Sequence, residues 1–110
     1  MSPVFITDQD QLVVWEPGEH HLEDNFKRFH ADNPHVYDEL IKLARRWRRN
    51  RPGDECGIGM LFEVARWNLL LSTVGEPVKL NNNYRAFYAR MIMEREPELD
   101  GLFRLRRQRP

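Results

Sequence analysis

The clearest hydrophobic pattern in the chain runs from residue 34 to about residue 50. Its apolar residues recur three and four positions apart, the spacing that places side chains on one face of a helix. Asn33 is a favourable N-cap and Pro34 suits the first helical position, while the turn-forming residues 51–53 provide a stop. The pattern predicts an amphipathic helix with an apolar stripe of Val36, Leu40, Leu43, Ala44 and Trp47.

The same spacing predicts helices over residues 19–31, from about residue 57 to before Gly75, and over 81–96. Pro97 limits the last of these and is expected to start a final short helix. The helix that begins near residue 57 is apolar around most of its circumference, so we expect it to lie centrally and to pack on more than one neighbour. Its main face comprises Ile58, Leu61, Phe62, Ala65 and Leu69, and Val64 and Leu71 are expected to widen it.

Two short β-prone runs, residues 4–6 and 12–15, flank a polar stretch near the N-terminus. They suit either a small hairpin or an extended arm packed on the helices. We therefore predict a mainly α fold, a small bundle of about four helices that is helix-turn-helix-like at best, with a short N-terminal β-arm or hairpin. The chain is expected to be a single domain, residues 1–110, with an arm over 1–18, a helical core over 19–103 and a basic tail over 104–110.

Composition narrows the setting in which such a domain works. The chain is 41% hydrophobic, enough to fold despite 31% charged residues. Cys56 is its only cysteine, so an intrachain disulfide is impossible and a cytoplasmic location is expected, the host bacterial cytoplasm if the chain is phage-encoded. No stretch approaches the ~18 continuous apolar residues of a membrane-spanning helix. We expect no membrane association.

The formal net charge is zero, but the charges are unevenly distributed. Residues 1–44 carry nine acids and three bases, residues 45–53 carry five arginines, and residues 77–110 carry eight bases and four acids. The acidic and basic parts either neutralise each other within the fold or form opposite faces of the molecule. The arginine run has two interpretations, a solvated helix end that complements the helix dipole or a patch for phosphate or an acidic partner.

The segment from residue 79 to residue 95 is the candidate binding surface. With its aromatic residues turned inward, the helix over 81–96 is expected to present Asn82, Asn83, Arg85, Ala86, Ala89 and Arg90 to solvent. Asn and Arg near a helix N-terminus can contact the edges of adenine and guanine, and basic side chains neutralise phosphates. The predicted nucleic-acid-binding residues are Lys79, Asn82, Asn83, Arg85, Arg90, Arg104, Arg106 and Arg107.

Catalytic chemistry requires a nucleophile near a base, or paired carboxylates, and no such set converges in the sequence. Cys56 precedes Gly57 at a helix start, but an inert thiol is the simpler interpretation. His20 and His21 point to different faces of a helix, and no second cluster completes a metal site. We therefore expect no enzymatic activity, no catalytic residues, no metal, no cofactor and no small-molecule substrate.

Several short stretches resemble an uncharacterised family of small proteins encoded by bacteriophages and prophages, over residues 26 to 107. No activity is established for that family, so the resemblance implies a setting in which small proteins often bind DNA or occupy a host protein. The stretches are Asn33-Pro34, residues 57–63 leading to Arg66-Trp67, residues 79–84 leading to Tyr88-Ala89-Arg90, and residues 96–99 leading to Leu102-Phe103.

The sequence thus predicts a non-enzymatic, phage-type regulatory domain that binds double-stranded DNA through the helix 81–96 and the basic C-terminus. The alternative is a protein-interaction module that binds itself, as a homodimer, or a bacterial host protein. That alternative is motivated by large apolar residues, notably Trp15, Trp47 and Trp67, on a chain with polarised charge.

Overall fold

A computed structural model of the chain describes residues 11–12, 20–76, 78–104 and 106–107. Over these residues the protein is mainly helical, as predicted. The helices are α1 (His20–Asp32), α2 (Pro34–Asn50), α3 (Ile58–Ser72) and α4 (Arg85–Arg95). Two short 3₁₀ helices flank α4, namely η1 (Asn82–Tyr84) and η2 (Pro97–Leu99).

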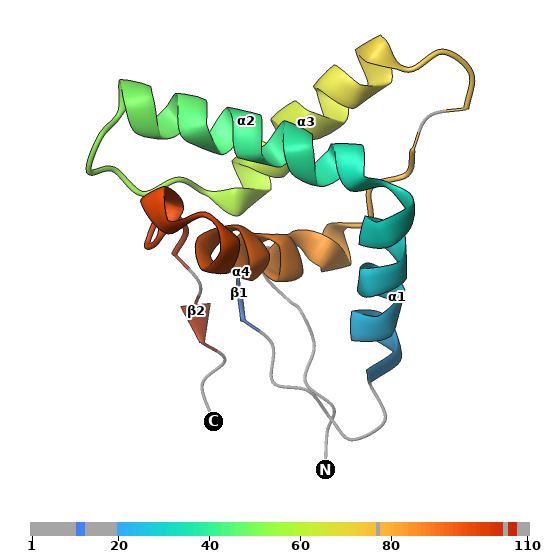
Figure 1. Ribbon diagram of the computed structural model, residues 1–110, viewed down its shortest axis with the longest axis horizontal. Helices are drawn as coiled ribbons and strands as arrows, with labels where there is room; N and C mark the ends of the chain where they lie inside the picture. The colour runs from blue at the N-terminus through green and yellow to red at the C-terminus, as the bar shows by residue number, and fades with distance from the viewer. Residues whose placement is uncertain (1–10, 13–19, 77, 105, 108–110) are drawn as a thin grey trace.

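The helices α2 and α3 cross each other above α4, and α1 stands beside one end of α4 (Figure 1). Only Asn33 separates α1 from α2, and its backbone N–H donates to the carbonyl of Phe29 over 2.8 Å. The predicted bounds of α2 are confirmed: it begins at Pro34 and ends before Arg51. Gly53, in the stop that follows, has φ of 87°, a conformation that favours glycine.

The core lies where α1, α2 and α3 meet α4. Tyr88 of α4 is completely buried and contacts the ring of Phe26 on α1 edge to face, with 4.8 Å between ring centroids. Phe26 also stacks on Phe87 at 5.0 Å. Helix α4 therefore has neighbours on most of its sides, and its buried residues are Arg85, Ala86, Phe87, Tyr88, Ala89 and Ile92.

The chain ends are joined by a short parallel pairing. Strand β1 (Gln11–Leu12) pairs with β2 (Arg106–Arg107), with Gln11 opposite Arg106. Nearby, Cys56 forms an isolated parallel bridge with Phe103. The first run predicted for the N-terminal hairpin, residues 4–6, lies outside the described residues, as do residues 13–15 of the second run. Within the described part of the chain, no helix has both the length and the apolar character needed to cross a membrane.

Candidate functional site

Arg85, the central residue of the predicted DNA-binding helix, does not face solvent. Its side chain is 3% exposed, lies over the ring of Phe62 at 5.8 Å, and donates from Nη2 to Oε2 of Glu63 over 3.1 Å. Ala86 and Ala89 are buried beside it. The prediction that Arg85, Ala86 and Ala89 form an outward face is therefore wrong, because α4 packs against neighbours on the side that the sequence pattern assigned to solvent.

The other predicted nucleic-acid-binding residues are spread over both ends of α4. Lys79, Asn82 and Asn83 are exposed before its first turn. Arg104 lies beyond η2 and is bound to Glu55 over 2.8 Å. The eleven residues of α4 alone extend about 16 Å, so these two groups do not form one compact surface. Arg90 is half-buried over the ring of Phe87, and the side chains of Arg106 and Arg107 lie outside the described residues.

A network around Glu63 joins α3 to the start of α4. Arg66 donates to Glu63, to the carbonyl of Leu80 over 3.0 Å and to Oδ1 of Asn82 over 2.6 Å. The hydrogen bond from Arg66, with the charges of Arg66 and Arg85, holds the pKa of the Glu63 carboxyl below its usual value. Arg85, which was predicted to contact nucleic acid here, is instead engaged within the protein.

The arginine run of residues 45–51 is also largely engaged. Arg45 binds Glu96 over 2.7 Å and Glu98 over 2.8 Å. Arg51 binds Asp54 over 2.8 Å and lies over the ring of Trp47. These ion pairs join basic groups of the arginine run to Asp54, Glu96 and Glu98, so Arg45 and Arg51 are neutralised within the fold.

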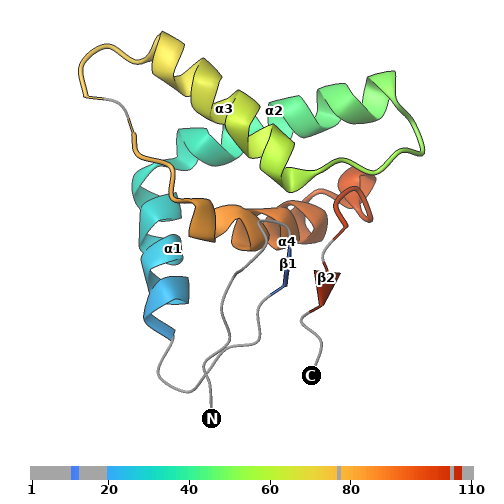
Figure 2. The same ribbon diagram turned by 180° about the vertical axis from the view of Figure 1, so that it is seen from behind.

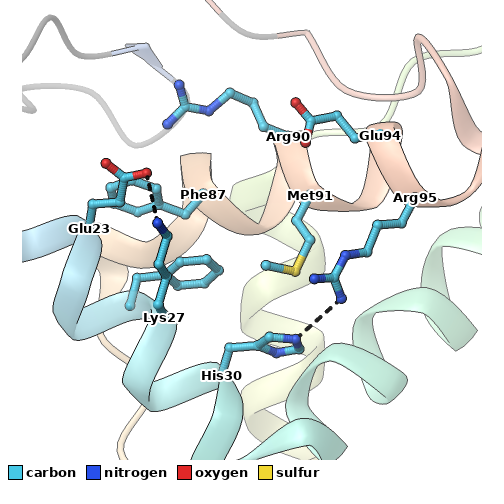
Figure 3. Close-up of a pocket in the computed structure, with 9 residues that line it drawn as sticks. Glu23, Lys27, His30, Phe87, Arg90, Met91, Glu94 and Arg95 are labelled. Carbon is cyan, nitrogen blue, oxygen red and sulfur yellow. Dashed lines mark hydrogen bonds and ion pairs between the residues drawn. The ribbon is translucent and has the colours of Figure 1, made fainter.

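An open cleft of about 670 Å³ lies between α1 and α4. Figure 3 shows Lys27 beside Glu23, and His30 reaching toward Arg95 from the opposite helix, at 3.8 Å and 3.5 Å respectively. Burial, followed by the charge of Arg95, lowers the pKa of His30. Lys27 pairs with Glu23 and His30 with Arg95, and the lining of the cleft includes no nucleophile beside a base.

Cys56 is 2% exposed, and its Sγ donates to the carbonyl oxygen of Gly57 over 3.8 Å. A thiol in this position is closed off from a substrate. Among the described residues, no group of three or more His, Cys, Asp and Glu side chains is placed to hold a metal ion.

The surface of α3 that faces away from α4 is apolar and exposed. Trp67 is 63% exposed and Leu71 is 69% exposed, although both belong to a helix whose other face forms the core. Large apolar residues are scattered singly on most protein surfaces, whereas a contiguous group marks an interaction site. We call this group the α3 outer face; its members are Met60, Val64, Trp67, Leu70, Leu71 and Val74.

Comparison with protein-family models, with curated proteins and with solved structures found no match.

The apolar residues of the α3 outer face are visible in the sequence, but two of them were predicted to be buried in the core. Val64 and Leu71 were expected to widen the core face, and this prediction is wrong: they are 41% and 69% exposed. Together with Met60 and Trp67 they form a second stripe along α3 with spacings of four, three and four residues. A helix with two apolar stripes normally has two partners, and the described residues supply a partner for only one of them.

An apolar groove adjoins the N-terminal half of the α3 outer face. It holds about 280 Å³ between α2 and α3, with Arg46 and Arg51 at its rim. Its floor is formed by Leu43, Trp47, Met60, Leu61 and Val64. The outer face is therefore hollowed near Met60 and projects near Leu71 and Val74, which are the most exposed of its members.

Proposed function

We propose that this protein is a protein-interaction module whose docking surface is the α3 outer face. The observation that carries the proposal is the gathering of the exposed large apolar side chains of the described surface on one helix and the residues just after it. Burying a large apolar side chain is worth about 1.5–3 kcal/mol relative to leaving it in water, so a partner that covers several of them gains substantial affinity.

The position of α3 supports this role. Its C-terminal half, drawn in yellow, extends away from α1 and α4, so a partner can approach it without displacing the core (Figure 2). Asn68 donates to Glu39 of α2 over 2.8 Å, and Arg66 holds the opposite side of the helix against Leu80. A helix fixed by such contacts presents its outer face ready-formed, which reduces the entropy lost on binding.

The chemistry of the face also suits a protein partner. None of its six members is charged, and Trp67 is a residue type that often contributes most of the energy of an interface. The nearest carboxylate on α3, that of Glu63, is already neutralised by Arg66 and Arg85. A partner therefore covers the face without desolvating an unpaired charge.

Site-specific photo-cross-linking tests this function in the cells that naturally make the protein. A benzophenone side chain is introduced in place of Trp67 or Leu71 and, as a control, in place of Arg28, which is exposed on α1. We expect discrete protein adducts from positions 67 and 71 and none from position 28. Absence of adducts from both α3 positions, with the protein folded and expressed, would overturn the proposal.

Binding to DNA remains a prediction. With Arg85 buried, it depends on Lys79, Asn82, Asn83 and the C-terminal arginines. Fluorescence anisotropy of a labelled duplex at about 50 mM salt, with the double substitution of Lys79 and Asn83 by Ala as the comparison, tests it while keeping the hydrogen bond from Arg66 to Asn82.

A further inference from the structure

The stripe along α3 has a symmetric spacing. Its members Met60, Val64, Trp67 and Leu71 follow one another at intervals of four, three and four residues, which are the same in both directions along the helix. Such intervals are the a and d positions of a heptad, the pattern by which helices pair along a seam. The midpoint of the stripe lies between Val64 and Trp67, with Met60 and Leu71 at equal distances on either side.

From this symmetry we infer that the partner of the α3 outer face is a second copy of the same chain, bound with the two α3 helices antiparallel about a two-fold axis that passes between Val64 and Trp67. The inference rests on the proposed function and names its partner. A two-fold interface requires a surface that is complementary to itself. In this arrangement Val64 lies opposite Trp67 and Met60 lies opposite Leu71, so that each a position faces a d position of the other copy.

The shape of the face agrees with this pairing. The groove beside Met60 and Val64 is the hollow part, and Leu71 and Val74 are the projecting part. Antiparallel pairing brings the projecting part of each copy to the groove of the other, so the two-fold axis produces two equivalent contacts. Leu71 and Val74, which are 69% and 99% exposed in the single chain, would become buried against an apolar floor.

Charge agrees as well. When identical surfaces meet, each charged residue near the axis faces a like charge, which costs energy. The four residues of the stripe are uncharged, and Glu63 beside them is bound to Arg66 and Arg85. The exposed area supports the same conclusion: six large apolar side chains that are 41% to 99% exposed exceed the few hundred Å² of apolar patch usual for a monomer and approach the ~800 Å² that each partner buries in a stable interface.

Sedimentation velocity on the purified protein, from about 1 μM to about 500 μM, tests the inference directly. We expect a species of twice the 13.2 kDa chain mass whose fraction grows with concentration. Trp67→Ala and Leu71→Ala should each raise the dissociation constant at least about tenfold, as expected for central apolar contacts. Arg28→Ala is the matched control and should leave it unchanged.

Disulfide formation tests the orientation. Cys56 is buried, so a cysteine introduced on the α3 outer face is the accessible thiol of the described surface. A mixture of Val64→Cys and Trp67→Cys proteins should form a disulfide between copies, because these two positions face each other beside the axis. Met60→Cys should not cross-link with itself, since antiparallel pairing separates the two copies of position 60 by roughly 16 Å, far beyond disulfide reach. A mixture of Met60→Cys and Leu71→Cys proteins should cross-link.

A monomer throughout the concentration range, a dimer insensitive to both alanine variants, or self-cross-linking at position 60 would overturn the inference. The outcome is separable from that of the proposed function. A monomeric purified protein that still gives adducts to other proteins from position 67 in cells retains the docking surface and excludes the second copy as its occupant. If the purified protein is monomeric and cross-linking gives no adducts, both the dimer and the docking surface on α3 are wrong.

Discussion

Arg85 of α4 and Glu63 of α3 form an ion pair in which only one partner is exposed. Their atoms Nη2 and Oε2 are 3.1 Å apart, and the side chains are 3% and 56% exposed. Nε and Nη1 of Arg85 have no hydrogen-bond partner among the described residues. The buried guanidinium therefore depends on a single carboxylate at the protein surface, and this carboxylate also receives Arg66.

Glu63→Gln should destabilise the protein by about 1–2 kcal/mol. The substitution leaves the buried charge of Arg85 without its counterion, a loss of 3–5 kcal/mol for a fully buried pair that is reduced here because Glu63 is half in solvent. Urea-induced unfolding measures the change. Glu94→Gln, at an exposed position of α4, serves as the control and should change the free energy of unfolding by less than about 0.5 kcal/mol.

The pair has a second signature, in acid. The pKa of Glu63 is lower in the folded protein than in the unfolded chain, so the unfolded chain binds its proton first as pH falls. The stabilisation is complete above the unfolded value, near pH 4.3, and is lost as pH decreases through the lower folded value. We expect the stability of the wild type to fall over this window and that of Glu63→Gln to fall less steeply. Parallel slopes for the two proteins, measured by urea unfolding at each pH, would contradict the assignment.

His30 should produce a separate transition near neutral pH. Burial, followed by the charge of Arg95, lowers its pKa below 6.5, while the carboxylate of Asp38 opposes the shift. The unfolded chain therefore binds a proton that the folded protein resists, and stability should decrease as pH falls below about 6.5. His30→Phe keeps an aromatic ring beside Phe26 and Tyr37 and should remove this part of the pH dependence.

His35→Gln is the comparison for this substitution, because His35 is exposed on α2. The measurement is the thermal midpoint between about pH 5 and pH 8. If the pH dependence of the thermal midpoint persists in His30→Phe but disappears in His35→Gln, the transition belongs to His35 and the assignment to His30 is wrong.

The boundaries of α2 could be predicted from sequence because they depend on local chemistry. Pro34 has a fixed φ and lacks an N–H, and the Pro52-Gly53 pair ends the helix without reference to any other part of the chain. The helical character of the fold was predictable for the same reason. The hydrophobic spacing of each helix is a property of its own residues.

The orientations of α3 and α4 were not predictable, because they depend on what packs against each helix. Both helices are apolar or small around most of their circumference, so periodicity gave no unique inner face. Arg85 is buried because Glu63 and the ring of Phe62 receive it, and Leu71 is exposed because the described chain places no element over it. The candidate surface consequently lies on α3 and not on the helix that the sequence favoured.

Tyr88→Phe should leave the protein as stable as the wild type or stabilise it by up to about 1 kcal/mol. The ring of Tyr88 is completely buried among aromatic neighbours, and its hydroxyl has no hydrogen-bond partner among the described residues. Burial also raises its pKa, so the hydroxyl is neutral at physiological pH. Removing a buried polar group without a partner recovers its desolvation cost and keeps the ring contacts with Phe26 and Phe62.

Tyr37→Phe removes the same group, a buried hydroxyl, but is expected to destabilise the protein. The hydroxyl of Tyr37 donates to Oε2 of Glu96 over 3.2 Å, so its removal should cost about 1 kcal/mol. Burial, followed by the charge of Glu96, raises the pKa of Tyr37 to about 12, so this hydroxyl is likewise protonated in the measurement. Urea unfolding of both variants at neutral pH compares them directly. If Tyr88→Phe lowers the free energy of unfolding by more than about 1 kcal/mol, the hydroxyl of Tyr88 is hydrogen-bonded in solution. If Tyr37→Phe leaves the free energy of unfolding unchanged, the hydrogen bond to Glu96 does not stabilise the contact between α2 and the end of α4.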